Sequence, residues 1–177
     1  MVEIQENYKD YTAPKNILKS VRRLVRHTPQ KFFVGLNIVH LTNTNALNRK
    51  NRRKKTISRK KRVVLSSCAG WYIQKWNNQP ARIELLVDKI YSDYPKWVLK
   101  IGFISDVAIS HTFFHELGHH IHKTQAPEHL EREDVADKWG NRLSRKYFWK
   151  RYWHIMVIIF PFKPFFDWLL KKYDEKN

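Results

Sequence analysis

Three residues within five positions, His115, Glu116 and His119, have the types and the spacing to bind a metal ion and to move a proton. Residues four positions apart in a helix advance by about 400°, so both imidazoles lie on one face and can reach a single ion. Glu116 lies one step around the helix. Two histidines that hold zinc, with a glutamate that takes a proton from a zinc-bound water, form a hydrolytic arrangement.

The run from Ser105 to Lys123 is predicted to be the helix that positions these residues. Ser105 or Asp106 can cap its start, and residues 124–127 end it. At 100° per residue, its apolar and histidine side chains fall on nearly opposite faces. The apolar face carries Ile109, Phe113, Phe114, Leu117 and Ile121, and the other face carries His111, His115, His119 and His122. A helix with one buried face and one open face suits a catalytic zinc site, because the metal must keep one coordination position free.

A third metal ligand is expected on a second helical segment that follows. Zinc held by two neutral histidines still needs a third protein ligand, and a carboxylate on an adjacent helix supplies it. Glu133 is the candidate, with Glu131 and Asp134 as alternatives because the gap after His119 is short. Asp137, one turn beyond Glu133, can accept the second ring N–H of a ligand histidine and fix its tautomer.

The HELGH sequence at 115–119, followed by Glu133, Ala136 and Asp137, resembles the gluzincin pattern of zinc metallopeptidases. The similarity is to the small single-domain minigluzincins and to ImmA/IrrE-type peptidases, and it extends over roughly residues 70–145. It implies a zinc-dependent metalloendopeptidase that hydrolyses peptide bonds with a zinc-bound water. The implied roles are Zn²⁺ ligands for His115, His119 and Glu133, general base for Glu116, and support of a ligand histidine for Asp137.

The resemblance also implies a protein or peptide substrate that lies extended along an edge strand and pairs with it. Residues 82–89 are the strand expected to do this. Its substrate contacts are expected from Arg82, Ile83, Glu84, Leu85, Leu86 and Val87. The group that stabilises the oxyanion is left open between Tyr72, Tyr147 and His154.

The hydrophobic pattern of the rest of the chain predicts an α+β fold. We expect a small antiparallel or mixed sheet of three to four strands, packed on the active-site helix and on the glutamate helix that follows it. One zincin-like domain is expected over residues 1–149. The expected strands are 31–41, 62–66, 70–75 and 81–91, and an amphipathic helix is expected at 14–27.

The chain is strongly basic, with 34 Lys and Arg against 16 Asp and Glu and a formal net charge of +18. Such a charge predicts attraction to nucleic acid or to an anionic membrane surface. The basic residues are densest in 48–62, which is predicted to be a solvated loop because so charged a block cannot enter a core. We expect this loop to contact nucleic acid or an anionic membrane, to act as a nuclear-import signal if the host is eukaryotic, or to have no dedicated partner. The alternative to a peptidase is therefore a basic nucleic-acid-associated protein with a structural or vestigial metal site.

The cysteine content and the composition of residues 1–15 indicate the cellular compartment. Cys68 is the only cysteine in the sequence, so neither an intrachain disulfide nor a cysteine zinc site can form. Residues 1–15 are polar and lack the apolar core of a secretory signal. These features predict a cytoplasmic protein.

The most apolar stretch of the chain, residues 147–170, lies near its end. The uninterrupted apolar core, Ile155 to Phe162, is well below the roughly 20 residues that span a bilayer. We expect residues 150–177 either to cover apolar faces of the domain or to anchor in a membrane interface, with peripheral contact through 150–172. Membrane association is thus the alternative to a purely cytoplasmic location.

Overall fold

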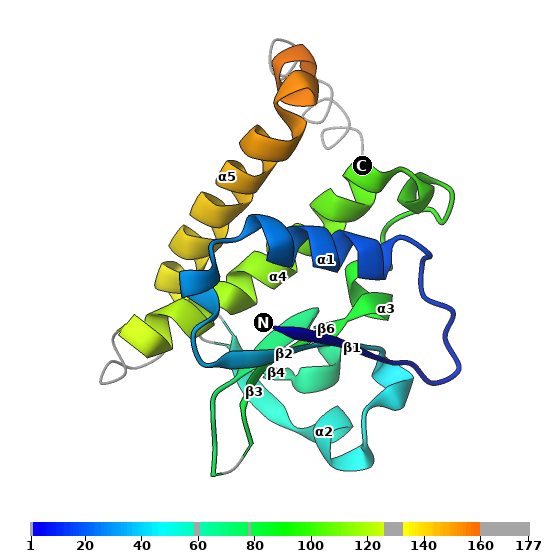
Figure 1. The fold of residues 1–177 in the computed structure, drawn as a ribbon. Helices are drawn as coiled ribbons and strands as arrows, with labels where there is room; N and C mark the ends of the chain where they lie inside the picture. Colours follow the sequence, from blue (N-terminus) through cyan, green and yellow to red (C-terminus); the bar gives the residue numbers. More distant parts are fainter. Residues whose placement is uncertain (1, 59–60, 78, 126–132, 160–177) are drawn as a thin grey trace. The chain divides into compact units, whose positions relative to one another are not determined.

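The structure, a computed structural model, describes residues 2–58, 61–77, 79–125 and 133–159 (Figure 1). The chain divides into two compact units, Met1–Ser144 and Arg145–Asn177. The first unit contains the sheet and the predicted metal ligands. The second is described over 145–159 only, so residues 160–177 of the predicted C-terminal segment lie outside the described residues.

A mixed sheet of four strands forms the centre of the first unit, in the order β1-β2-β6-β5. The strands β1 (Glu3–Asn7), β2 (Leu36–Thr42) and β6 (Ala81–Leu86) run parallel, and β5 (Gly70–Ile73) pairs antiparallel with β6. The central strands are rich in Leu, Ile and Val, as expected of strands that are buried on both faces. The predicted α+β fold with a small mixed sheet is confirmed.

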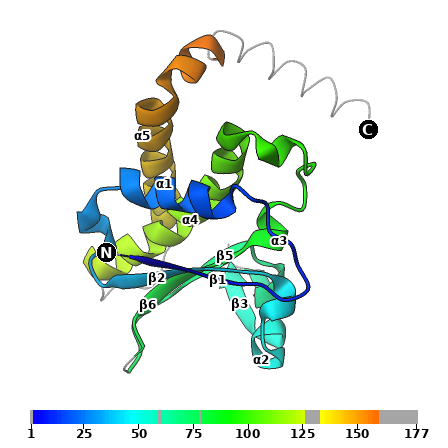
Figure 2. The same ribbon diagram turned by 45° about the vertical axis from the view of Figure 1, so that its right-hand side comes forward.

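Two helices cover one side of this sheet, α1 (Ile17–His27) and α4 (Gly102–Gln125), while α2 lies on the other side (Figures 1 and 2). The predicted apolar face of α4 forms the core between these layers. Ile109, Phe113 and Leu117 are fully buried there. The predicted helix at 105–123 is therefore confirmed, although it begins three residues earlier than expected. The last helix, α5 (Glu133–Ile159), departs from helical geometry at Tyr152.

Shorter elements connect these layers. The further α-helices and strands are α2 (Arg49–Arg53), β3 (Lys55–Ser58), β4 (Lys61–Val64) and α3 (Val87–Ile90). The 3-10 helices are η1 (Gln30–Phe33), η2 (Thr44–Ala46), η3 (Leu65–Ser67) and η4 (Val98–Lys100). The strands β3 and β4 form a separate antiparallel hairpin.

The basic segment 48–62 does not form the predicted loop. It contains α2, β3 and the start of β4. The side chain of Asn48 caps α2 by accepting a hydrogen bond from the Asn51 backbone N–H at 2.7 Å. The charge of the segment keeps its side chains out of a core, but it does not prevent a short capped helix and a hairpin from forming.

The predicted substrate strand is wrong, because β6 is an inner strand that pairs with β2 and β5 on its two sides. Val87 does not belong to the strand at all, since it begins α3. Glu84 accepts bonds of 2.8 Å from His40 and from Arg82. Burial opposes its ionisation, but these two bonds outweigh that effect and lower the pKa of Glu84. The Glu84 carboxylate therefore links side chains of β2 and β6 within the sheet.

A buried polar network joins α1 to the start of α4. The Arg23 guanidinium donates two hydrogen bonds to the fully buried Asp106 carboxylate, one of them 3.1 Å long. Ser20 and Ser105 join their hydroxyls at 3.1 Å, and the Tyr91 hydroxyl donates to the Ser105 carbonyl at 3.2 Å. Ser105 and Asp106 are thus inside the helix and bind neighbouring elements, instead of capping its end.

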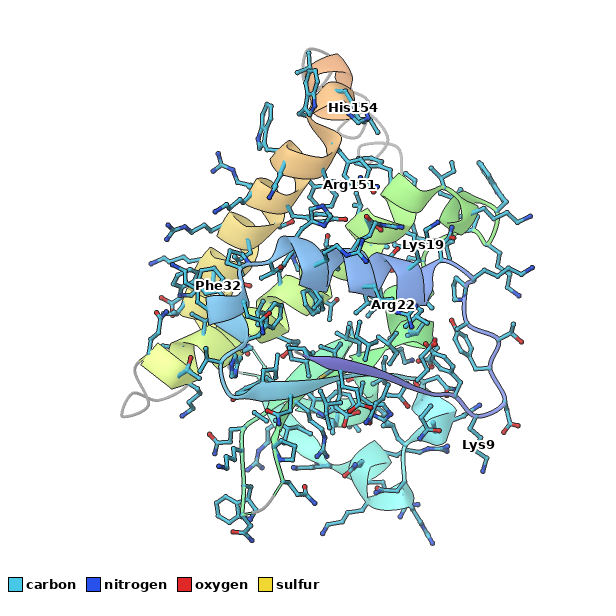
Figure 3. The ribbon with its side chains drawn as sticks, viewed as in Figure 1. Lys9, Lys19, Arg22, Phe32, Arg151 and His154 are labelled. Atoms are coloured by element: carbon cyan, nitrogen blue, oxygen red, sulfur yellow. The ribbon has the colours of Figure 1, made fainter. Side chains whose placement is uncertain are left out.

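We expect Arg23→Ala to lower the free energy of unfolding by about 3 kcal/mol, because it leaves the buried Asp106 carboxylate without its guanidinium. Arg22→Ala is the matched control, since Arg22 is the exposed neighbour on α1 (Figure 3) and its loss should cost less than about 0.5 kcal/mol. Urea unfolding monitored by circular dichroism measures both. Equal losses in the two variants would contradict a stabilising role for the Arg23–Asp106 pair.

Candidate metal centre

Two helices bring three potential ligands to one point. His115 and His119 lie on α4, and Glu133 is the first residue of α5. The Nε2 atoms of the two histidines are 3.1 Å apart. Glu133 Oε2 lies 3.4 Å from Nε2 of His115 and 3.8 Å from Nε2 of His119. Among the described residues, these three form the group that could hold a metal ion.

The spacing of these atoms fits a tetrahedral zinc ion. Bonds of about 2.0–2.2 Å at tetrahedral angles place neighbouring ligand atoms about 3.3–3.6 Å apart. The three measured separations, from 3.1 to 3.8 Å, bracket that value. Two nitrogens and one carboxylate oxygen are also a donor set that zinc accepts while a fourth position stays open. The cluster is a candidate zincin-like metal site.

Asp137 prepares His115 for this role. Its Oδ1 lies 2.9 Å from His115 Nδ1, so the ring nitrogen donates its proton there and the Nε2 lone pair is left for a metal. Burial and the neighbouring His119 lower the pKa of His115, against the opposing effect of Asp137 and Glu133. The lowered pKa favours the neutral imidazole, which is the form that binds a metal ion.

A close helix crossing sets the distance between the ligands. A Cβ added at Gly118 would lie 2.5 Å from the carbonyl oxygen of Ala136 on α5. A Cβ added at Gly140 would lie 3.3 Å from the backbone of His115. Glycine at both positions lets the two backbones approach, and this approach brings Glu133 to the histidines. Phe32 of η1 packs edge-to-face on Trp139 of α5, with the ring centroids 5.4 Å apart.

Glu116, the predicted base, is buried on α4. The charge of Glu116 acts on the thiol of Cys68, which is half-buried and precedes β5. Burial raises the pKa of the Cys68 thiol, and the charges of Glu116 and Glu133 raise it further. The thiol stays protonated near neutral pH, and Cys68 is not in the group of potential metal ligands.

The other histidines have separate surroundings. His120 is buried, donates from Nε2 to the Val34 carbonyl at 3.0 Å, and accepts at Nδ1 from the Tyr72 hydroxyl at 3.2 Å. It ties α4 to β5 and to the turn before β2, a contact that periodicity along one helix does not reveal. His122 is buried as well, whereas His111 is exposed. His129 lies outside the described residues, as does Glu131, the first alternative ligand.

Asp134, the second alternative ligand, is exposed and does not belong to the three-residue group. A small cavity of about 20 Å³ lies between α4 and α5, with room for about one water molecule. It is lined by His111, His115, Asp137, Gly140, Asn141 and Ser144. The cavity lies beside the His115–Asp137 bond and is too small for a substrate side chain.

Comparison with known proteins adds no family assignment: no family model matches the chain, and no curated protein or solved structure matches it either. The metal site is therefore supported by the identities of its residues and by their geometry.

Proposed function

We propose that the chain is a zinc-dependent metallopeptidase that hydrolyses peptide bonds within proteins. The observation that carries the proposal is that His115, His119 and Glu133 converge within tetrahedral ligand distances. The buried Glu116 directly follows His115 in the sequence. A structural zinc site is typically closed by four protein ligands, whereas three ligands with an open position are typical of a catalytic one.

A zinc ion held by these residues would supply Lewis-acid activation of water and of the substrate carbonyl. The residues of the chain perform the remaining steps. Glu116 accepts a proton at its carboxylate from the attacking water, as the water oxygen bonds to the carbonyl carbon. Glu116 then donates this proton to the amide nitrogen as the C–N bond breaks. One water is consumed, and a carboxylic acid and an amine are released.

We further propose that the substrate pairs with β5. Among the described strands of the main sheet, β5 and β1 are the two edges, and β5 is the edge that packs on α4. A Cβ added at Gly70 would lie 2.7 Å from the Thr112 side chain, so β5 runs close to the metal-binding helix. An extended peptide that adds to the free side of β5 gains main-chain hydrogen bonds with no demand on its sequence.

We expect Glu133→Ala to weaken zinc binding at least about 100-fold, because it removes one of three ligands. Asp134→Ala is the matched control, since Asp134 is the exposed neighbour on the same helix turn. Titration against a chelating zinc indicator measures both affinities, and digestion of an unfolded protein substrate measures activity. Unchanged zinc affinity in Glu133→Ala would remove Glu133 from the site.

A further inference from the structure

The second unit exposes three large apolar side chains on α5. Trp149, Trp153 and Val157 are 45%, 59% and 53% exposed, and they follow one another at four-residue intervals. Trp149 precedes the departure from helical geometry at Tyr152, and Trp153 and Val157 follow it. Single exposed apolar residues are ordinary, but two tryptophans and a valine exposed within one short segment indicate a surface that meets another molecule. We call these three residues the Trp-Val stripe.

The same stretch of α5 packs its other aromatic residues against one another. Tyr147 and Tyr152 are buried, and Phe148 stacks on Tyr152 with ring centroids 5.9 Å apart. Tyr147 contacts both of these rings, at 5.2 and 6.2 Å. Tyrosine and phenylalanine thus form an internal cluster, from which both tryptophans of the stripe are excluded.

The segment that carries the stripe is strongly basic. Residues 145–159 contain Arg145, Lys146, Lys150 and Arg151 and no acidic residue, and all four cations are exposed. The Arg151 guanidinium lies over the Tyr152 ring at 5.7 Å, and Arg151 and His154 project from this part of α5 (Figure 3). Tryptophan beside lysine and arginine is the composition of helices that lie in the headgroup region of a membrane.

We propose that residues 145–159 dock on an anionic lipid bilayer, with the Trp-Val stripe in the interface and the four cations against the headgroups. No helix in the described part of the chain combines the length and the apolar character needed to cross a bilayer, so the inferred contact is parallel to the surface. This inference goes beyond the proposed peptidase activity and does not depend on it.

Two other occupants fit the stripe less well. A second copy of the chain would bring four cations against four cations in a symmetric contact, which opposes association. Nucleic acid would satisfy the cations and could stack on tryptophan, but it gives Val157 no apolar surface. A bilayer satisfies both the charge and the apolar side chains.

The test measures binding of the full chain to sedimented vesicles of phosphatidylcholine, with and without phosphatidylserine. We expect binding to the anionic vesicles, and a loss of about tenfold or more in Trp149→Gln/Trp153→Gln. The matched control is Trp76→Gln/Trp97→Gln, since both of these tryptophans are 69% exposed and lie in the first unit. The control should bind as the unsubstituted chain does.

A second variant tests the charges. Each cation near an anionic surface contributes about 1 kcal/mol, so Lys150→Gln/Arg151→Gln should weaken binding to anionic vesicles by on the order of 10- to 30-fold. Equal binding of the unsubstituted chain and of both α5 variants would overturn the proposal. So would displacement from vesicles by duplex DNA together with loss of DNA affinity in the tryptophan variant, since that result assigns the stripe to nucleic acid.

Discussion

Glu116→Gln is expected to retain zinc and to lose peptide hydrolysis by about 10²- to 10⁴-fold. The amide of glutamine has nearly the shape of the carboxylate, but it cannot accept the proton that the attacking water must give up. Because Glu116 is not one of the three clustered ligands, the metal-binding atoms of His115, His119 and Glu133 are unchanged by the substitution.

Two measurements check this expectation. Elemental analysis after extensive dialysis gives the zinc content, and cleavage of a fluorescently labelled unfolded protein gives the rate. Glu116→Asp separates the chemistry of the base from its position, since it keeps a carboxylate but withdraws it by one methylene. We expect Glu116→Asp to be more active than Glu116→Gln and less active than the unsubstituted chain.

The possible outcomes discriminate between roles for Glu116. Full activity in Glu116→Gln would show that another group accepts the proton. Loss of zinc in the same variant would show that Glu116 holds the site together, and the assignment as base would then lack support. Retained zinc with lost cleavage also argues against a purely structural metal, because a structural site has no need of a proton acceptor.

The ligand-bearing helices are the part of the fold that the sequence predicts well. Their signals are local. Two histidines four residues apart lie on one face of any α-helix, and so do Glu133 and Asp137. The predicted contact of Asp137 with a histidine of the pair is also observed, at His115, although it requires in addition that one helix face the other. Local periodicity therefore predicts the candidate metal ligands with little knowledge of the sheet.

The order of the strands is the part that the sequence does not predict. β1 is short, polar and at an edge, so Glu3–Asn7 gives no hydrophobic signal, yet it pairs with β2 along its full length. Pairing partners in a parallel sheet are distant in the sequence, and alternation within β6 says nothing about which neighbours it has. The error in placing the substrate strand has this origin.

The close crossing of α4 and α5 is also not predicted from the sequence, although the residues at the crossing lie within the gluzincin-like pattern. Gly118 occupies a variable position of the pentapeptide, and Ala136 separates Glu133 from Asp137. Their small size could have indicated that the two helix backbones touch at this point. The structure gives the reason for the small residues, since a Cβ at Gly118 would meet the Ala136 backbone.

Gly118→Ala is accordingly expected to weaken zinc binding on the order of 10- to 100-fold, the range seen when the support of a metal ligand is lost. The added Cβ would lie 2.5 Å from the Ala136 carbonyl oxygen and 2.9 Å from its Cα, so α5 must move away and take Glu133 with it. Overpacking of this kind also lowers the free energy of unfolding by about 1–3 kcal/mol.

Gly102→Ala is the matched control, because Gly102 lies on the same helix and an added Cβ would meet only the Arg23 side chain, at 3.8 Å. Chelator competition measures zinc affinity, and urea unfolding measures stability. The atoms in the way at Gly118 belong to the Ala136 backbone, so the double change Gly118→Ala/Ala136→Gly should not restore zinc affinity. Rescue by that second change, or normal affinity in Gly118→Ala alone, would show that Glu133 reaches the metal without the close crossing.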